Sequence, residues 1–265
     1  MKDEVKAKIK ERIANSIKTY LDGKEVTTTQ ILDDIFPVER RVRSIIGGLE
    51  TSLGTTLWEP TAKQLAESNG YKILNEKEFP TPEIMPVEVS AIISKWIGMR
   101  NKPGAHLTLD GFIKEVKQQC KKVDYSAIPK ETLTSGEGID LWIEKDSVQY
   151  VYDIKTNQIN AKGGNSMSNS LMLWYASKFV YEPDADFKAA IAFPFNPYKK
   201  KDWWDKNGSR AYPMVKNMDG FVGNEFWNKL SGDNNTLESI LGLFKELGDE
   251  NFGDQFKDVF YPPKK

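Results

Sequence analysis

The sequence predicts an α/β fold with a mixed central sheet flanked by helices, and three observations indicate it. The first 70 residues have helical spacing, residues 138 to 158 contain two neighbouring strand-like segments, and residues 188 to 195 form an apolar run closed by prolines. Helices and strands therefore alternate along the chain, which places helices on the faces of the sheet.

The amino-terminal block is predicted to be helical. An amphipathic pattern with a spacing of four ends at Asp22-Gly23, and it consists of Val5, Ile9, Ile13, Ile17 and Leu21. A longer helix is expected over residues 38 to 58. Pro60 suits the first turn of a continuing helix, which Gly70 should end.

A strand is expected next, over residues 71 to 79, followed by an insertion at residues 80 to 135 that holds two predicted helices. The later elements are a strand at 139 to 144, a strand at 148 to 158, a helix at 165 to 181 and a strand at 188 to 195. No repeat or linker divides the chain. We therefore expect one domain over residues 1 to 265, with a helical segment at 1 to 37 and a carboxy-terminal extension at 196 to 265.

The composition limits the chemistry that the chain can carry. It has 265 residues, of which 39% are hydrophobic and 28% charged, with one Cys and one His. These counts exclude a disulfide framework, Cys/His zinc clusters and any site that needs two imidazoles. Neither a signal-length apolar run nor an apolar run of transmembrane length occurs, so we expect a cytoplasmic protein without a membrane partner.

Charge is balanced overall but unevenly placed. The net charge of −1 argues against a protein that coats nucleic acid indiscriminately. Residues 95 to 122 nevertheless carry seven Lys or Arg against two acids, and residues 195 to 216 carry six against two. These two regions are therefore candidates for a local basic face.

One constellation combines acids and a lysine inside strand-like sequence. Asp153, Lys155 and Asn157 fall on one face of their strand, because side chains alternate with a period of two. Asp140 lies on the preceding strand, and its direction depends on the hairpin between the two. A four-residue loop over residues 145 to 148 pairs Glu144 with Gln149 and places Asp140 opposite Asp153.

Other hairpin loops remain open at this stage. A two-residue loop at Lys145-Asp146 would put Asp140 diagonal to Asp153 on the same face, whereas an odd loop length would send Asp140 to the other face. Lys-Asp is a poor type I′ turn, which favours the four-residue loop.

Two carboxylates this close repel each other unless a cation lies between them. Mg²⁺ suits the position, since it accepts carboxylates, a backbone carbonyl such as that of Ile154, waters and a phosphate oxygen. Lys155 can then stabilise charge on the phosphate, or orient and help to deprotonate an attacking water. Together Asp140, Asp153 and Lys155 indicate phosphodiester hydrolysis.

The acid-x-Lys pattern is weak by itself, because the chain contains five such triplets. The other four lie in predicted helix, turn or loop and lack an acid on a neighbouring strand. The alternative is an exposed sheet face with ordinary charges, on which an ion pair contributes little. Apolar residues crowd both strands, where unpaired charges are costly, and this favours the functional interpretation.

Asp140 followed by Asp153-Ile154-Lys155, within this order of elements, resembles the PD-(D/E)XK nuclease superfamily and its type II restriction endonucleases. Ile139 stands where that pattern has proline. The resemblance implies a restriction-endonuclease-like core with a helical insertion and a carboxy-terminal extension. It also implies an Mg²⁺-dependent endonuclease that cuts both strands of DNA to leave 5′-phosphate ends, with Asp140 and Asp153 as metal ligands and Lys155 as the catalytic lysine.

Members of this superfamily often add an acid from the helix before the first strand. Glu50 and Glu59 are the two candidates, and nine residues at 100° each place them on opposite sides of a helix. Glu50 lies on the stripe of Leu53 and Leu57, which should face the sheet, so Glu50 is preferred. A surface glutamate is the alternative.

Candidate DNA contacts lie in three regions. The loop after the catalytic strand offers free N–H groups and small polar side chains, although an ordinary capped loop explains it equally well. A lysine cluster before Trp203-Trp204 can grip the backbone, or can be a surface loop anchored by the tryptophans. The insertion offers cations for base reading. The candidates are Asn157, Lys162, Asn165, Ser166, Ser168, Lys199, Lys200, Lys201, Arg100 and Lys102.

Three functions follow from these residues. The leading one is a type II restriction endonuclease that acts as a homodimer on double-stranded DNA, since a two-fold enzyme matches a palindromic site. The others are a repair or recombination nuclease that selects DNA structure, and a DNA-binding protein without catalysis. Phosphate-loop, nucleophile-elbow and dinucleotide-binding motifs are absent from the sequence. A Cys120–His106 nucleophile pair is disfavoured, because Cys120 falls on the apolar stripe of a predicted helix.

Overall fold

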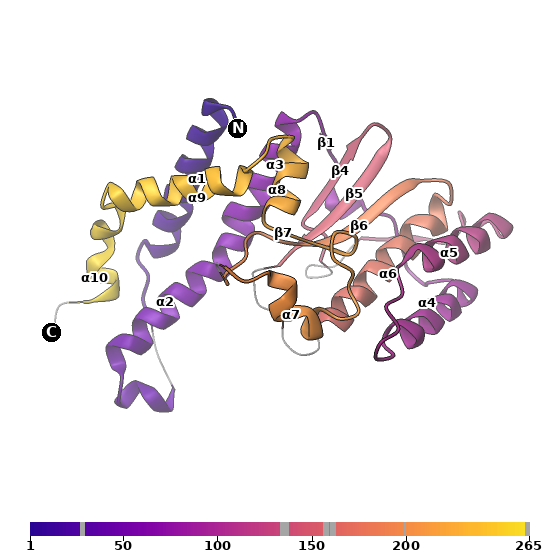
Figure 1. Cartoon of the computed structure of the whole chain (residues 1–265), viewed down its shortest axis with the longest axis horizontal. Helices are drawn as coiled ribbons and strands as arrows, with labels where there is room; N and C mark the ends of the chain where they lie inside the picture. The colour runs from indigo at the N-terminus through magenta and orange to yellow at the C-terminus, as the bar shows by residue number, and fades with distance from the viewer. Residues whose placement is uncertain (27–29, 133–137, 156–158, 160–162, 199, 263–265) are drawn as a thin grey trace. The chain divides into compact units, whose positions relative to one another are not determined.

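The computed structural model describes residues 1–26, 30–132, 138–155, 159, 163–198 and 200–262 (Figure 1). Tertiary contacts divide the chain into two compact units, one of residues 1–65 with 227–265 and the other of residues 66–226. The sequence marks neither boundary, because each falls inside a helix, α3 (Glu59–Ser68) or α8 (Asn224–Ser231).

The unit of residues 66–226 is built on a mixed five-stranded sheet in the order β1-β4-β5-β6-β7 (Figure 1). The strands are β1 (Lys72–Ile73), β4 (Leu141–Lys145), β5 (Val148–Ile154), β6 (Asp186–Phe193) and β7 (Gly220–Val222). β1, β4 and β5 pair antiparallel, whereas β5, β6 and β7 run parallel. Helix α6 (Gly163–Tyr181) provides the crossover that a parallel connection from β5 to β6 requires.

The core of this unit lies on the face of the sheet that α6 covers. Leu171 and Phe179 of α6 are fully buried together with Val151 of β5 and Ile191 of β6. Helices α4 (Val87–Arg100) and α5 (Asp110–Lys122) also contact α6, which explains why this helix is apolar nearly all round.

The other face of the sheet is closed by aromatic rings. Tyr152 of β5 is 1% exposed, and its ring centroid lies 5.2 Å from that of Phe226 and 6.4 Å from that of Phe221. Strand β5 is therefore central and buried on both faces, as its apolar sequence indicated.

The insertion is tied at its two ends by a small second sheet. β2 (Thr81–Pro82) pairs antiparallel with β3 (Lys130–Glu131), and α4 and α5 lie between them in the sequence. The two helices confirm the prediction for the insertion. The small sheet was not predicted, because two-residue strands carry no alternation to detect.

The first strand is shorter than predicted. Only Lys72–Ile73 pair with β4, and the chain then turns into the 3-10 helix η3 (Glu76–Glu78). The side chain of Asn75 accepts a hydrogen bond from the N–H of Lys77 at 3.2 Å, and this cap turns the chain away from the sheet.

The carboxy-terminal extension contributes to both units. Within residues 196 to 226 it adds helix α7 (Trp203–Ala211) and strand β7 to the sheet unit. The later part contains α9 (Thr236–Asp249), η4 (Phe252–Phe256) and α10 (Lys257–Phe260), which fold with the amino-terminal segment.

The unit of residues 1–65 and 227–265 is helical. Its amino-terminal elements are α1 (Asp3–Leu21), the 3-10 helix η1 (Ile31–Asp34), α2 (Pro37–Leu53) and the π-helical turn η2 (Gly54–Trp58). Helix α1 lies along α9, where Lys10 Nζ is 3.1 Å from Glu246 and 2.7 Å from Glu250. The predicted helix ending at Asp22-Gly23 is confirmed, with Gly23 at φ +60°.

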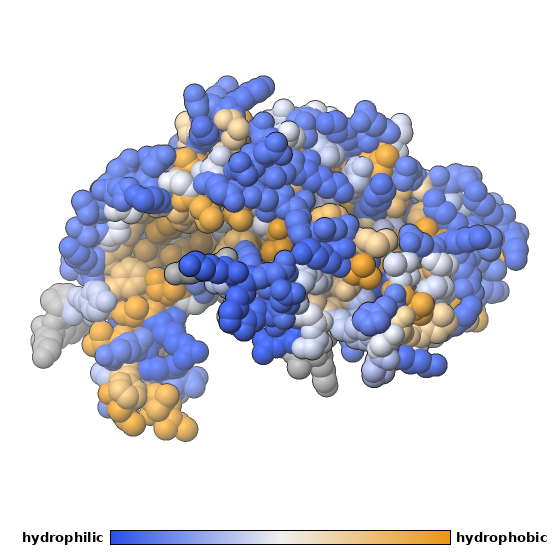
Figure 2. Space-filling view, viewed as in Figure 1, coloured by the Kyte–Doolittle hydropathy of each residue, from blue (hydrophilic) through white to orange (hydrophobic). Residues whose placement is uncertain are grey.

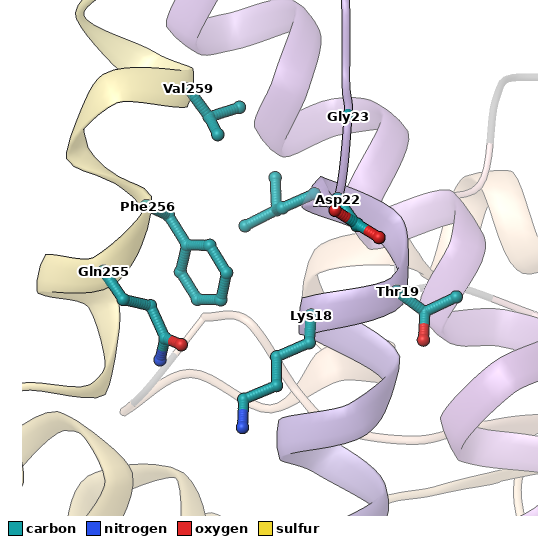
Figure 3. Close-up of a pocket in the computed structure, with 8 residues that line it drawn as sticks. Lys18, Thr19, Asp22, Gly23, Gln255, Phe256 and Val259 are labelled. Carbon is teal, nitrogen blue, oxygen red and sulfur yellow. The ribbon is translucent and has the colours of Figure 1, made fainter.

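A groove of about 410 Å³ separates the end of α1 from η4 and α10 in this unit (Figure 3). Phe256 and Val259 extend into it from one side, and Lys18, Thr19 and Asp22 line the other (Figure 3). The groove holds no pair of carboxylates, so it does not provide the chemistry predicted for the strand aspartates.

No helix in the described part of the chain is both long enough and apolar enough to cross a membrane.

Candidate active site

The hairpin of β4 and β5 sets the position of the two predicted catalytic aspartates. Glu144 pairs with Gln149, which is the register expected from the sequence, and the pairing continues to Lys145 opposite Val148. Asp146 and Ser147 form the turn with φ values of +52° and +64°. A two-residue turn with positive φ at both positions matches the right-handed twist of the strands, so this turn gives the register without a longer loop.

The start of β4 departs from regular pairing at Asp140. Leu141 is the register partner of Tyr152, yet the N–H of Asp140 also donates to the Tyr152 carbonyl at 2.9 Å. Two consecutive residues therefore face Tyr152, as at a β-bulge. The Asp140 side chain turns toward β5, where its Oδ2 accepts a hydrogen bond from the N–H of Ile154 at 2.6 Å.

Asp153 and Lys155 lie together at the end of β5. The Asp153 side chain is 5% exposed, and its Oδ1 lies 2.7 Å from Nζ of Lys155, whose side chain is 43% exposed. The N–H of Lys155 donates to the Ala192 carbonyl at 2.9 Å, which extends the pairing with β6. The lysine thus reaches solvent from a backbone position fixed by the sheet.

The electrostatics of the site are dominated by burial. The pKa of Asp153 is raised to about 7, with burial as the largest cause; Lys155 lowers the pKa, and the neighbouring Asp140 carboxylate raises it. The site therefore brings together two carboxylates and one ammonium group, and one of the carboxylates is poorly solvated.

The Ile154 carbonyl also faces this region. The Tyr152 carbonyl points toward β4, since it accepts from Asp140. Carbonyl directions alternate along a strand, so that of Ile154 points to the same side. A backbone oxygen is thus directed toward the segment that holds the Asp140 carboxylate.

Two further residues shape the site and were not predicted from the sequence. Gly138 has φ +85°, and a Cβ atom at this position would lie 3.1 Å from Asp153 Oδ2 and 3.3 Å from Trp174 Cζ2. Trp174 belongs to α6 and is 4% exposed. The glycine before Asp140 was a visible signal for a close approach, but nothing in the sequence indicated that Trp174 would meet it.

At this site the described residues bring two carboxylates together. No group of three or more His, Cys, Asp or Glu side chains in the described part of the chain is placed to hold a metal ion. Any ion bound here would therefore draw on two carboxylates and oxygens from backbone, water or substrate.

Glu50 lies on α2 in the other compact unit and is exposed. The predicted contribution of Glu50 to the site stays a prediction, as does the choice between Glu50 and Glu59.

The predicted DNA contacts fall into three groups. Asn157, Lys162 and Lys199 lie outside the described residues. The exposed candidates are Asn165 and Ser166 in the first turn of α6, together with Lys102, Lys200 and Lys201. Ser168 and Arg100 are each 0% exposed. Because their side chains are buried, Ser168 and Arg100 cannot contact DNA in this structure, which contradicts the prediction for these two residues.

Arg100 instead forms buried polar contacts within the fold. Its Nη2 donates to the Pro213 carbonyl at 2.8 Å and pairs with Asp219 Oδ2 at 2.5 Å. It therefore ties the end of α4 to the segment that precedes β7. The count of charges along the insertion could not reveal this partner, which is 119 residues away in the sequence.

The tryptophans beside the lysine cluster anchor it to the core. Trp203 is 1% exposed, and its ring centroid lies 4.3 Å from that of Phe193 in β6. Asp202 caps α7 by accepting hydrogen bonds from the N–H groups of Trp204 and Asp205. Lys200 and Lys201 are held next to this fixed point and are exposed.

Comparison with known families agrees with this geometry. The family described as "Type II restriction endonuclease, HinfI" matches residues 1–248, which includes both aspartates and Lys155. A search of curated proteins found no match. The mixed sheet with flanking helices is consistent with the restriction-endonuclease-like fold that the resemblance implied. The chain therefore belongs to the HinfI family of type II restriction endonucleases, site-specific deoxyribonucleases.

Proposed function

We propose that the chain hydrolyses both strands of a specific double-stranded DNA sequence in an Mg²⁺-dependent reaction that leaves 5′-phosphate ends. The observation that supports this most directly is the buried Asp153 carboxylate beside Asp140, with Lys155 Nζ 2.7 Å away. A buried carboxylate beside a second carboxylate lowers the stability of the fold, and a bound cation would relieve this cost. Such a pair therefore indicates a cation site.

The residues at the site fit Mg²⁺. Asp140 and Asp153 provide carboxylate oxygens, and the Ile154 carbonyl points to the same side, so the donor set consists of the hard oxygens that Mg²⁺ prefers. The raised pKa of Asp153 is caused mainly by burial, so the charged carboxylate is poorly solvated and a bound cation would stabilise it. When bound, Mg²⁺ would supply positive charge to the scissile phosphate and lower the pKa of water.

Lys155 is the residue placed to act on the reacting groups. Its partly exposed ammonium group can stabilise the phosphate as charge develops, or orient a water and help to deprotonate it. The hydroxyl of that water bonds to phosphorus, the bond from phosphorus to the 3′ oxygen breaks, and a proton passes to the 3′ oxygen. The phosphate then remains on the 5′ end.

We assign sequence recognition and DNA contact to exposed polar residues of the chain. Asn165 and Ser166 lie in the first turn of α6, and the backbone N–H groups at the start of a helix favour a phosphate or a base edge. Lys102, Lys200 and Lys201 are exposed cations suited to the DNA backbone.

Glu50 is proposed as an additional acid of the site. A homodimer is proposed because a two-fold enzyme matches a palindromic site and makes two cuts.

A digest of a plasmid of known sequence tests this proposal. With Mg²⁺ we expect discrete fragments with 5′-phosphate ends, and with EDTA no cleavage. Asp153→Ala and Lys155→Ala should lose cleavage by about 10³-fold or more, comparable with the loss of a group that stabilises the transition state. Asp186→Ala, which removes an exposed acid at the start of β6, is the matched control and should cleave normally.

The other outcomes are equally informative. Smearing or a preference for branched DNA would indicate a nuclease that selects DNA structure, and intact DNA at every metal concentration would exclude catalysis. Near-normal cleavage by Asp153→Ala or Lys155→Ala would show that the reaction takes place elsewhere.

A further inference from the structure

The segment that joins η1 to α2 presents apolar side chains to solvent. We call it the apolar tip, and it consists of Ile31 (90% exposed), Leu32 (48%), Ile35 (64%), Phe36 (49%) and Val38 (49%). Figure 2 shows a continuous hydrophobic patch at the place where Figure 1 draws η1 and the start of α2. Scattered exposed apolar residues are normal, but five within eight positions form a patch that indicates a binding surface.

Polar interactions hold the tip in this orientation. The backbone N–H of Gln30 donates to Asp33 Oδ2 at 2.6 Å, and Asp33 Oδ1 accepts from Arg40 Nε at 3.1 Å. The side chains of Asp33 and Arg40 are only 14% and 23% exposed. The charged residues thus face inward and the apolar residues outward, which is the reverse of an ordinary surface turn.

The tip continues along one side of α2. Val38, Val42 and Ile46 recur at a spacing of four, and Ile46 is 40% exposed. Ile45, by contrast, is fully buried and packs with Leu21 of α1. Helix α2 therefore places Ile45 in the core of its unit, while Val38, Val42 and Ile46 extend the exposed patch.

The area of the tip matches what a stable dimer needs. Its five residues expose on the order of 600 Å², which is the upper end of the largest patch on an ordinary monomer. If a second copy covered the whole of this surface with its own, about 1,200 Å² would be buried in total, which is the lower limit for specific and stable interfaces.

The charges around the tip are also self-complementary. Asp34, Glu39 and Arg43 are exposed, and none of them forms an ion pair with another described residue. In a two-fold interface contacts are reciprocal, so a residue away from the axis that meets a second residue of the other copy is matched by the same contact in reverse. The acids of one copy can therefore face Arg43 of its partner on both sides of the apolar contact.

We propose that the apolar tip is the surface through which two copies of this chain form a two-fold dimer. The inference rests on the proposed function in one respect, because a two-fold dimer matches a palindromic site and makes both cuts. The apolar area, the inward-facing charges and the unpaired charges around the tip support it independently of DNA.

Sedimentation of the full chain without DNA or metal tests the inference. Wild type should be dimeric at micromolar concentration. Ile35→Asp should raise the dimer dissociation constant by at least about 100-fold, because both copies would bury an unpaired charge. Leu241→Asp places the same charge at a residue of α9 that is 44% exposed, outside the tip, and should leave the dimer intact.

A cross-linking experiment covers the case in which Ile35→Asp fails to fold. The single native thiol, Cys120, is buried, so an introduced cysteine is the main site of reaction. Ile35→Cys treated with a short bismaleimide should give covalent dimers much faster than Leu241→Cys. Cross-linking at equal rates, a monomeric wild type or an unchanged dimer in Ile35→Asp would overturn the inference.

Failure of the dimer and failure of the function can be distinguished. A chain that cuts plasmid DNA at discrete sites but sediments as a monomer would refute the dimer and its surface, but not the proposed cleavage reaction. A chain that dimerises through the tip but leaves DNA intact with Mg²⁺ would refute only the proposed function.

Discussion

Asp153 is held in the folded chain in a setting that does not favour its charge. Burial raises its pKa to about 7 from the model-compound value of 3.8. Between these two pH values the folded state binds more protons at this position than the unfolded state. The contribution of Asp153 to the free energy of unfolding is therefore greatest at low pH and falls as the pH rises toward 7.

This predicts that Asp153→Asn stabilises the metal-free protein at pH 8, on the order of one unit above the pKa of about 7, since the amide resembles the protonated acid. Melting temperatures in EDTA at pH 5 and pH 8 measure the effect, which should shrink at the lower pH. Mg²⁺ should raise the melting temperature of wild type and of the control variant, but not that of Asp153→Asn. The exposed Asp186→Asn is the control, and a lower melting temperature for Asp153→Asn at pH 8 would contradict the prediction.

Gly138 provides a second test at the scale of one residue. Gly138→Ala combines a strained backbone with a Cβ atom only 3.1 Å from Asp153 Oδ2. We expect a loss of about 1–2 kcal/mol in the free energy of unfolding from the positive φ alone. We also expect cleavage to slow by about 10–100-fold, because small displacements of catalytic groups have effects of this size.

The matched control for this variant is Gly70→Ala. Gly70 has φ +81°, but a Cβ atom there would meet no atom within 4 Å. Urea denaturation should show a similar loss of stability in both variants, whereas a cleavage assay should separate them. Equal cleavage rates would show that the contact with Asp153 does not matter for activity.

At the scale of elements, the sequence predicted the pairing of β4 with β5 but not its end. The alternation of apolar residues and the preferred register placed Glu144 opposite Gln149, and the structure confirms this pair. The turn could not be assigned, since Asp146-Ser147 lacks the glycine that usually marks two positive φ values. The bulge at Asp140 depends on backbone hydrogen bonds that no spacing rule expresses.

Alanine variants of Arg100 and Lys102 test whether the residues at the end of α4 stabilise the fold or contact DNA. Arg100→Ala should lose about 3–5 kcal/mol of unfolding free energy, because it leaves the buried Asp219 without its partner. Lys102 is exposed, so Lys102→Ala should keep its stability while DNA binding weakens and the salt dependence of binding falls by about one counterion. A stable Arg100→Ala with weakened DNA binding would contradict this assignment.

At the scale of the whole molecule, local sequence patterns predicted individual helices and strands better than the way in which these elements are assembled into compact units. The amino-terminal helices and the residues after Trp227 fold into one unit although they lie far apart in the sequence. Strand β7 was also missed, because three residues beginning with Gly220 give no strand signal, yet they pair with β6. Such long-range partners follow from tertiary packing, which spacing within a segment does not encode.

The proposed dimer makes a final prediction about how cuts are coupled. If two copies act together on one site, wild type should convert supercoiled plasmid largely to the linear form. Ile35→Asp should accumulate nicked circles, because a copy without its partner cuts one strand before a second copy arrives. Leu241→Asp should behave like wild type.

A time course of plasmid forms on an agarose gel at limiting enzyme measures this coupling. Raising the concentration of Ile35→Asp should restore the linear product, since mass action favours the weakened dimer. Linear product from Ile35→Asp at the same low concentration as from wild type would mean that the two cuts do not depend on the apolar tip, even if the tip associates in free solution.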